Sequence, residues 1–402
     1  MADYDLVVYG ATGFTGRLVA EYLASRDAPV AVALAGRSEG KLESVRADLG
    51  VDWPLIVADA ADPKALRKLA RSTRVVLATV GPYWQHGLPV VEACAKAGTH
   101  YADLAGEVLF MRESIDRYDQ IAKKTGARIV HASGFDSIPS DLGVHLLHEA
   151  AGAELGETVM AVRRVSGGFS GGTVASGAGQ AEAANDPKLR RIMGDPYALT
   201  PGERGPDHGD QLWVRYEPVL DSWTGPFVMA GINTRVVRRS NLLRGYAYGR
   251  DFQYKEVVAT GAGLGGRIRA AAVAAATTGG MAALGIGPTR AVARRLLPKP
   301  GEGPSAQTRE RGGFQVEFRS ILADGRVFGA EVIGQGDPGY AATARMLGES
   351  GLCLAETEGP GGVLTPASAM GDDLVERLRE AGMTLRAWQV NAGATVTGSG
   401  VH

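Results

Sequence analysis

Short apolar runs alternate with longer stretches of helical periodicity between Tyr4 and about Ile138. Compact apolar runs bounded by Gly, Pro or Asp are typical of buried strands, whereas apolar residues that recur every three or four positions predict amphipathic helices. We expect strands at 5–9, 30–35, 54–57, 75–79, 100–103 and 128–131, and helices at 16–26, 41–49, 63–70, 87–97 and 110–124. This alternation predicts an α/β fold, a doubly wound parallel sheet with helices on both faces.

The pattern changes after Glu149, where strand-like segments separated by Gly/Pro turns predict a mostly antiparallel sheet. Its strands are expected at 157–175, 211–219, 227–237, 313–321 and 325–332. Helical periodicity returns at 336–354 and 372–381. We therefore predict a parallel-sheet domain at 1–145, an inserted α+β domain at 146–335, and carboxy-terminal helices at 336–402 that pack back on the first domain.

Composition agrees with a globular chain of more than one domain. Apolar residues make up 45% of the chain and charged residues 22%, which is normal for a folded protein. A chain of 402 residues is too long for one ordinary core. The formal net charge of −1 gives no global field that would attract nucleic acid, so we expect no nucleic-acid partner.

Cysteine usage and the first residues of the chain indicate a reducing compartment. Cys94 and Cys353 are too few for a disulfide framework or, alone, for a metal site, so we expect two reduced thiols and no metal. Asp3 and Asp5 precede only a short apolar run, which is unlike a secretory signal. A cytoplasmic protein is expected, with at most a peripheral contact at the inner membrane surface.

A glycine-rich loop directly follows the first expected strand. The spacing Gly10-x-x-Gly13-x-x-Gly16 supplies a tight turn, close backbone approach to a pyrophosphate and close helix–strand packing. The amino terminus of the next helix presents free N–H groups to phosphates. The loop predicts a Rossmann-type dinucleotide site, at the carboxyl ends of the strands. The loop residues expected to contact the cofactor are Gly10, Thr12, Gly13, Phe14, Thr15 and Gly16.

The end of the second expected strand predicts which nucleotide binds. NAD enzymes place an acidic residue here for the ribose 2′-hydroxyl, but this chain has Arg37, followed by Ser38 and Lys41. A guanidinium can bind a 2′-phosphate through two hydrogen bonds, so NADP(H) is the expected cofactor. Two further loops complete the expected site, with Asp59 and Ala60 beside the adenine and Val80, Gly81 and Pro82 beside the pyrophosphate and nicotinamide ribose.

Several motifs resemble one known family. The segments GATGFTG (10–16), VGPYWQHG (80–87), THYADLAGE (99–107) and HASGFDSIPSDLG (131–143) are similar to the saccharopine dehydrogenase family, and most similar to its trans-acting enoyl reductase branch. The resemblance continues at 170–177, 339–355 and 361–378. It implies an NADPH-dependent oxidoreductase that reduces the α,β-double bond of an acyl thioester, carried by a polyketide synthase, in lipid biosynthesis.

Two other functions fit the same residues. One is a weakly catalytic or non-catalytic NADP-binding protein at a lipid surface. The other is a saccharopine-type amino-acid dehydrogenase, although no residue set that would hold a diacid amino acid is identifiable in the sequence.

The proton donor for a reduction is left open by the sequence. Suitable side chains near the expected strand ends are Tyr83, His86, Tyr101 and Asp103. For each of them we favour an ordinary role in packing, hydrogen bonding or loop bracing. Glu107 is interpreted as a loop brace, and Asp136 and Asp141 as turn and helix-cap residues.

Segment 257–301 is rich in Ala and Gly and has no acidic residue. Its cations are Arg267, Arg269, Arg290, Arg294, Arg295 and Lys299. Three interpretations stay open: a solvated insertion, an amphipathic surface for anionic lipid, or a docking site for an acidic acyl-carrier protein.

Overall fold

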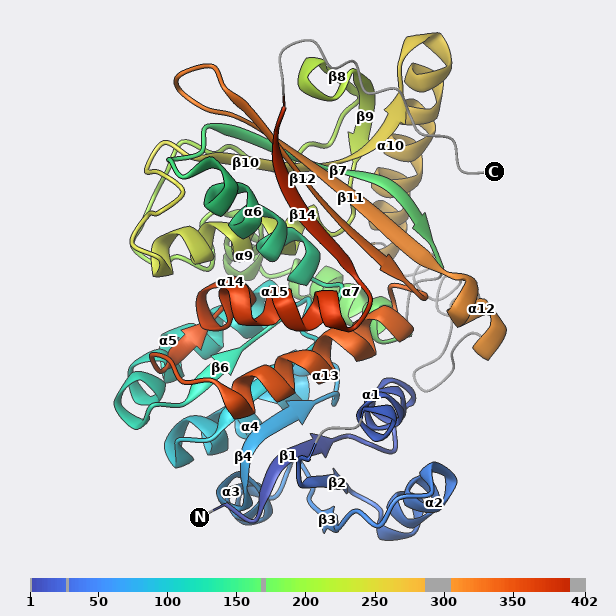
Figure 1. The fold of residues 1–402 in the computed structure, drawn as a ribbon, viewed down its shortest axis with the longest axis vertical. Helices are drawn as coiled ribbons and strands as arrows, with labels where there is room; N and C mark the ends of the chain where they lie inside the picture. The colour runs from blue at the N-terminus through green and yellow to red at the C-terminus, as the bar shows by residue number, and fades with distance from the viewer. Residues whose placement is uncertain (1, 27–28, 168–170, 286–304, 391–402) are drawn as a thin grey trace.

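Two seven-stranded sheets form the framework of the molecule, with helix α6 (Ile138–Ala151) packed between them (Figure 1). The computed structural model describes residues 2–26, 29–167, 171–285 and 305–390. The parallel-sheet domain contains the amino terminus, and the second sheet lies at the other end of the molecule.

The first sheet is parallel throughout, in the order β13-β6-β5-β4-β1-β2-β3. Its first six strands in chain order confirm the predicted doubly wound sheet, since 3-2-1-4-5-6 is the Rossmann order. The strands are β1 (Tyr4–Tyr9), β2 (Val32–Gly36), β3 (Leu55–Val57), β4 (Thr73–Ala78), β5 (His100–Asp103), β6 (Arg128–Val130) and β13 (Gly362–Leu364).

Helices cover both faces of this sheet because successive strand residues point to opposite sides. Leu6 and Val8 pack on one face with α1 (Phe14–Ser25), α2 (Glu39–Leu49) and α13 (Ala341–Glu356). Val7 and Tyr9 pack on the other face with α3 (Pro63–Ser72), α4 (Tyr83–Ala97) and α5 (Val108–Thr125).

The second sheet has the order β14-β12-β11-β7-β10-β9-β8. Only β7 and β10 pair in parallel, so the predicted mostly antiparallel sheet is confirmed. The strands are β7 (Glu157–Ser166), β8 (Arg215–Glu217), β9 (Ser222–Pro226), β10 (Gln253–Gly261), β11 (Gly313–Ile321), β12 (Val327–Gln335) and β14 (Thr384–Val390).

Three predicted strands of this region need correction. The segment 227–237 lies largely in helix α9 (Ala230–Leu243), whose buried Ile232, Val236 and Ser240 recur every four residues, as on one helix face. Its β-branched residues suggested a strand, but packing on several sides overrides that local preference. The strand predicted at 157–175 ends at Ser166, and α7 (Gly171–Ala183) follows. Only 215–217 of the segment 211–219 is a strand, and the 3-10 helix η1 (Pro218–Leu220) follows it.

The carboxy-terminal segment enters both sheets. Helix α13 packs on α1 and β4, and β13 pairs with β6 at the edge of the parallel sheet. Helices α14 (Pro366–Ala369) and α15 (Gly371–Glu380) follow, and β14 then pairs with β12 in the second sheet. The boundaries predicted at 145 and 335 stay a prediction.

The Ala/Gly-rich segment 257–301 begins in β10 and continues as helix α10 (Gly263–Gly285), which packs on β9. Arg290, Arg294, Arg295 and Lys299 lie outside the described residues. The remaining helices are α8 (Pro187–Gly194) and α12 (Ala306–Arg311). Within the described part of the chain, we find no helix with the length and apolar character needed to cross a membrane.

Candidate functional site

The glycine loop between β1 and α1 has no space for larger residues. Gly10 has a φ of 93°, and an added Cβ there would lie 2.8 Å from both Thr79 Oγ1 and Val80 Cγ2. A Cβ on Gly16 would overlap the Gly10 carbonyl oxygen and lie 2.6 Å from Thr79 Oγ1. These two glycines therefore let α1 and the loop after β4 close around the turn.

The amino terminus of α1 is open to an anion. Gly13 precedes the helix without a side-chain cap, and the first turn has no acidic residue. The N–H of Arg17 donates to Gly13 O, so the N–H groups of Phe14, Thr15 and Gly16 come before the first helical hydrogen bond. Free N–H groups and the positive helix end fit a pyrophosphate at this point.

The ends of β2 and β3 form the neighbouring part of the site. Arg37, Ser38 and Lys41 are exposed after β2, and within the described ranges no ion pair involves Arg37. Burial and the nearby Asp59 charge raise the pKa of Tyr9 to about 12, while Arg37 opposes this shift. Arg37 and Asp59 therefore lie near each other at adjacent strand ends.

Smaller contacts tie these loops to the glycine loop. Thr12 Oγ1 lies 3.7 Å from where a Cβ on Gly36 would be. Asp59 Oδ1 accepts the N–H of Ala61 at 2.8 Å, which fixes the turn that contains Ala60. The predicted adenosine-side residues are thus brought to one edge of the sheet.

The loop after β4 lies against the glycine loop. Thr79 N–H donates to Tyr9 O at 2.9 Å, and Val80 meets Gly10 as described above. The Gly81–Pro82 peptide bond is cis, and α4 begins directly after it. The crevice between β1 and β4 is the switch point at which doubly wound sheets bind dinucleotides.

An aromatic contact closes one side of the glycine loop. The rings of Phe14 and Tyr340 meet edge to face at 4.8 Å, and the guanidinium carbon of Arg309 lies 5.3 Å from the Phe14 centroid. Helix α13 starts only at Ala341, later than predicted, because Pro338 and Gly339 form a turn before it. The sequence did not indicate that this turn would reach the first loop.

Tyr83 is a structural link between strand ends. Its buried Oη donates to Ala78 O at 2.9 Å and accepts the Leu104 N–H at 3.2 Å. Burial, with the Asp103 charge, raises the pKa of Tyr83 well above its ordinary value. His86, by contrast, lies exposed on the first turn of α4. The two candidates from this loop are therefore in different environments.

Asp103 belongs to a buried hydrogen-bonded chain. Its Oδ1 accepts the N–H groups of Ala105 and Ala132, and its Oδ2 lies 2.8 Å from His131 Nδ1. His131 Nε2 in turn lies 2.8 Å from Ser114 Oγ. Tyr101 is buried with its ring edge to face against His131, and burial raises its pKa well above its ordinary value. This chain joins the ends of β5 and β6 to α5 and is shielded from solvent.

Glu107 connects the parallel-sheet domain to α7. The side chain is 2% exposed, and its two oxygens accept the N–H groups of Tyr83 and Trp84 at 2.9 Å each. Ser176 Oγ of α7 donates to the same carboxylate at 2.6 Å, and Gln180 Nε2 donates to Gly106 O. Glu107 is thus a brace, as predicted. It caps the amino terminus of α4 and joins that helix to α7, although both are distant from it in sequence.

Asp136 and Asp141 do not cap their own helix. Ser137 precedes α6 without a side-chain cap, and Asp141 accepts hydrogen bonds from Ser240 Oγ and the Ala367 N–H. Burial and the Asp103 charge raise the pKa of Asp136 to about 7. Short polar residues before a helix are typical of caps, so the sequence alone had no signal for these other environments.

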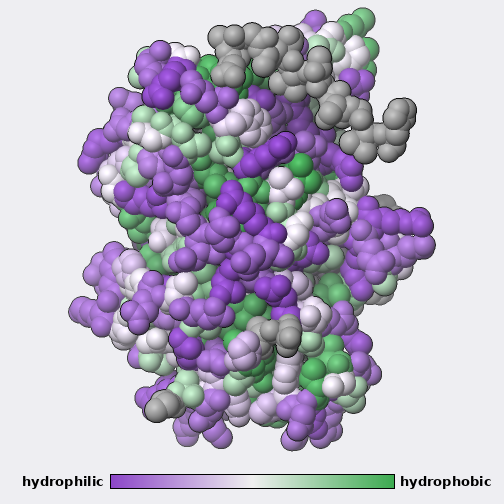
Figure 2. Space-filling model, in the orientation of Figure 1, coloured by the Kyte–Doolittle hydropathy of each residue, from purple (hydrophilic) through white to green (hydrophobic). Residues whose placement is uncertain are grey.

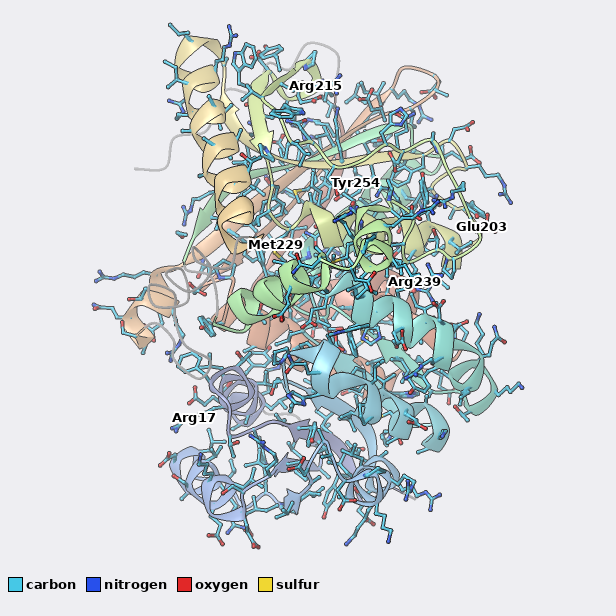
Figure 3. All side chains as sticks on the ribbon, turned by 180° about the vertical axis from the view of Figure 1, so that it is seen from behind. Arg17, Glu203, Arg215, Met229, Arg239 and Tyr254 are labelled. Carbon is cyan, nitrogen blue, oxygen red and sulfur yellow. The ribbon has the colours of Figure 1, made fainter. Side chains whose placement is uncertain are left out.

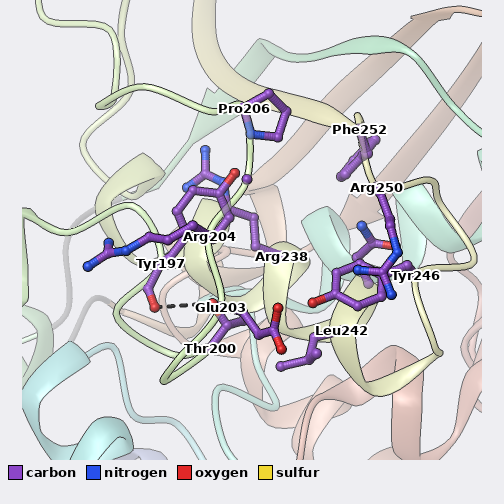
Figure 4. A pocket seen from close by; sticks show the side chains of 12 residues that line it. Tyr197, Thr200, Glu203, Arg204, Pro206, Arg238, Leu242, Tyr246, Arg250 and Phe252 are labelled. Atoms are coloured by element: carbon purple, nitrogen blue, oxygen red, sulfur yellow. Dashed lines mark hydrogen bonds between the residues drawn. The ribbon is translucent and has the colours of Figure 1, made fainter.

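A second pocket lies away from this edge, between the 195–206 segment, α9 and the 246–252 loop (Figure 4). Arg238, one of three arginines that line it, already donates to Asp207, to Pro196 O and to Tyr254 O. The close-up also shows Arg250, whose guanidinium carbon lies 4.1 Å from the Tyr246 centroid. Arg238 and Arg250, which line this pocket, are thus already engaged by other protein groups.

Sequence comparisons identify relatives of the whole chain. Residues 6–130 match the family model described as the saccharopine dehydrogenase NADP binding domain. A trans-acting enoyl reductase from Mycobacterium ulcerans is 45% identical over 417 residues, covering 97% of this chain and 99% of that protein. A trans-acting enoyl reductase from Mycobacterium tuberculosis is 45% identical over 412 residues, covering 95% of this chain and 97% of that protein.

A comparison with solved structures supports the same fold. Saccharopine dehydrogenase (L-Glu forming) from Saccharomyces cerevisiae superposes with a TM-score of 0.55 at 14% identity, covering 96% of this chain and 100% of that chain. At this identity the likeness shows the fold alone. Together with the full-length relatives, it confirms the resemblance seen in the motifs: the chain belongs to the trans-acting enoyl reductase family and carries the NADP-binding domain of the saccharopine dehydrogenases.

Proposed function

We propose that the protein is an NADPH-dependent enoyl reductase that acts on an α,β-unsaturated acyl thioester. The observation that supports NADPH as the cofactor is the uncapped amino terminus of α1, together with an exposed Arg37 that forms no ion pair with any described residue. The names of the full-length relatives support the reaction. A saccharopine-type reaction has less support, because the saccharopine dehydrogenase shares only the fold.

The chain's own residues would divide the binding work. Phe14, Thr15 and Gly16 would donate backbone N–H groups to the pyrophosphate, and Arg37 with Ser38 would hold the 2′-phosphate. Bound NADPH supplies a hydride. Lys41, Asp59 and the loop of Val80, Gly81 and Pro82 would line the remaining nucleotide surface. The reduction also requires that the protein polarises the thioester oxygen and delivers a proton to the α-carbon.

The substrate would be delivered by another protein. Trans-acting is the word in the relatives' names, and it supports an acyl chain held on the acyl-carrier protein of a polyketide synthase. The proposed function therefore predicts turnover of acyl thioesters carried by an acyl-carrier protein, in addition to those of a small coenzyme.

The direct test is to mix the protein with NADPH and each of a panel of 2-enoyl thioesters. The absorbance of the reduced nicotinamide measures how fast NADPH is oxidised. Oxidation that depends on the double bond, with the saturated thioester as product, is the expected result. Tight NADPH binding without turnover on any enoyl thioester would instead favour a non-catalytic nucleotide-binding protein. NAD(P)H-dependent turnover of saccharopine or its precursors would indicate the amino-acid dehydrogenase reaction.

Arg37→Ala tests the cofactor assignment. We expect the wild type to prefer NADPH over NADH by at least about tenfold, equivalent to about 1.4 kcal/mol, and the variant to lose most of this preference. Isothermal titration with both nucleotides measures it. Arg71→Ala, an exposed arginine on α3, is the control and should bind both nucleotides like the wild type. Equal affinities in the wild type would contradict the role of Arg37.

We also infer that the exposed side of α10 contacts an anionic lipid surface. Leu264 and Ile268, one turn apart, are 73% and 62% exposed, and Arg267 between them lies 5.3 Å from the Trp223 centroid. Trp213, before β8, is 77% exposed and its carbonyl accepts from Gln211. Apolar residues with cations and no acids are typical of interfacial helices.

The place of this surface fits a peripheral contact. Figure 3 shows Arg17 on the parallel-sheet domain and Arg215 at the opposite end of the molecule, beside α10. Figure 2 shows hydrophilic residues over much of one face, with apolar residues at several places, including near the upper end of α10. A lipid contact there would leave the nucleotide edge of the first sheet accessible.

A further inference from the structure

Asp136 occupies the edge of the sheet where chemistry is expected. It lies in the 131–137 loop between β6 and α6, and β6 is separated from β4 only by β5. Neighbouring strands are about 4.8 Å apart, so this loop lies roughly 10 Å from the loop after β4. That distance keeps Asp136 on the nicotinamide half of the crevice, away from the adenosine side at β2 and β3.

The loop that carries Asp136 is held on both sides. Ala132 N–H donates to Asp103 Oδ1 at 3.1 Å, and Ser133 N–H donates to Asp103 O at 2.7 Å. Phe135 N–H donates to Thr343 Oγ1 of α13 at 3.0 Å. Since the residues before Asp136 are fixed by three hydrogen bonds from two elements, its carboxyl group has a defined position.

Two glycines flank the carboxyl group. A Cβ on Gly134 would lie 3.0 Å from Asp136 Oδ2, and a Cβ on Gly106 would lie 3.7 Å from Oδ1. The side chain itself is only partly buried. Gly134 and Gly106 thus lie next to the carboxyl group, with Leu104 and Thr343 also close to Gly134.

The groups that face Asp136 are acidic or neutral. Asp103 of β5 acts on it through charge, Asp136 in turn acts on Tyr83 of α4, and Thr343 lies beside its loop. Across the described ranges, no Lys, Arg or His forms an ion pair with Asp136. Burial and the Asp103 charge raise its pKa to about 7, so a protonated acid is well populated near neutral pH.

The neighbouring candidates are already occupied. Tyr83 Oη donates to Ala78 O, and the Asp103 oxygens accept from two N–H groups and contact His131. Neither can release a proton to a substrate without losing a structural hydrogen bond. The carboxyl group of Asp136 accepts a hydrogen bond from its own backbone N–H, and within the described ranges no other element of the fold holds it.

We propose that Asp136 is the proton donor to the α-carbon of the enoyl thioester, an inference that rests on the proposed function. The O–H bond of Asp136 breaks as a C–H bond forms at the α-carbon, and the hydride from the bound cofactor forms the C–H bond at the β-carbon. The carboxylate left on Asp136 then takes a proton from water, which restores the acid for the next turnover.

Asp136→Asn tests this role. We expect NADPH affinity to stay within about twofold and the single-turnover rate with a 2-enoyl thioester to fall by about 10²–10⁴, the usual contribution of general acid catalysis. In the wild type the rate should fall as pH rises through about 7, because only the protonated acid can donate. The variant should lack this pH dependence. Asp52→Asn, an exposed loop carboxyl, is the matched control and should behave like the wild type.

A readout without turnover comes from infrared titration of the protein free of cofactor. The wild type minus Asp136→Asn difference should contain a protonated carboxyl band that disappears with a midpoint near pH 7. Asp136→Glu keeps an acid and should recover part of the rate, which separates loss of the proton from loss of the fold.

The outcomes distinguish this inference from the proposed function. Full turnover by Asp136→Asn, or no protonated carboxyl in the difference spectrum, would overturn the role of Asp136 and leave the reductase intact. A wild type that binds NADPH but reduces no enoyl thioester would overturn the reductase itself, and the proton donor with it.

Discussion

At the scale of single residues, the glycine loop was the part of the site that sequence could predict. The spacing of Gly10, Gly13 and Gly16 indicates a tight turn with close backbone packing, and Arg37 indicates a positive charge at the end of the second strand. Glu107 was correctly interpreted as a brace, but its partner in α7 and the environment of Asp136 could not be assigned in this way. Their roles depend on Asp103 and Ser176, which lie far away in the chain, and a carboxylate before a helix looks the same whether it caps, braces or donates.

Gly16→Ala gives a prediction at this scale. The new Cβ would overlap the Gly10 carbonyl oxygen and crowd Thr79 Oγ1, so α1 must move away from the turn. We expect a loss of about 1–3 kcal/mol in the free energy of unfolding and at least about tenfold weaker NADPH binding. Chemical denaturation and calorimetric titration measure the two effects.

Gly40→Ala is the matched control for that substitution. Gly40 lies in α2, and a Cβ there would meet nothing within 4 Å. Its stability should equal that of the wild type or slightly exceed it, because alanine restricts the unfolded chain. Its NADPH affinity should not change. A Gly16→Ala protein that binds NADPH normally would show that close packing of helix and loop is not required.

At the scale of elements, local pattern predicted the first domain well and the second less well. The crossover strands and helices were found to within a few residues because each buries a regular apolar face. Helix α9 was missed because Ile232, Thr234, Val236 and Val237 favour a strand locally. Its buried Arg239 donates to Leu199 O at 2.7 Å and to Val363 O, and these contacts with distant segments are invisible in a single window of sequence.

Helix α10 carries the prediction at this scale. Replacement of Leu264 and Ile268 together by Ser removes two exposed large apolar side chains from the described part of this helix. We expect at least about fivefold weaker co-sedimentation with vesicles that contain anionic lipid, since each buried apolar side chain contributes about 1.5–3 kcal/mol. NADPH affinity should not change.

Val228→Ser is the control for α10. Val228 is also exposed, but it lies in the turn before α9. It should leave vesicle binding unchanged. A double variant that sediments like the wild type but loses turnover with carrier-linked substrate would instead identify α10 as a carrier-protein surface.

At the scale of the whole molecule, buried carboxyl groups make stability depend on pH. Glu256 of β10 accepts hydrogen bonds from Tyr254 Oη at 2.8 Å and from Asn233 Nδ2 of α9 at 2.9 Å. Burial raises the pKa of Glu256 to about 7, and burial also raises the pKa of Asp141 to about 6. Both groups therefore bind protons more tightly in the folded state than in the unfolded chain.

The free energy of unfolding should fall as pH rises from about 4.5 to about 7. In this window the folded protein holds protons that the unfolded chain has released, so each rise in pH favours unfolding. Glu256 alone would contribute on the order of 3 kcal/mol to this fall, and Glu256→Gln should remove its part. Urea denaturation at several pH values measures the slope. Glu380→Gln, on the exposed side of α15, should keep the wild-type slope.

The edge strand β13 has a consequence for how the protein is made. Residues 362–364 complete a sheet whose other strands all belong to the first 130 residues, and α13 covers one face of that sheet. A nascent chain on the ribosome would therefore have to keep part of this apolar face uncovered and a strand edge unpaired until nearly nine-tenths of the polypeptide has been synthesised. We expect the emerging amino-terminal domain to need a chaperone during that wait.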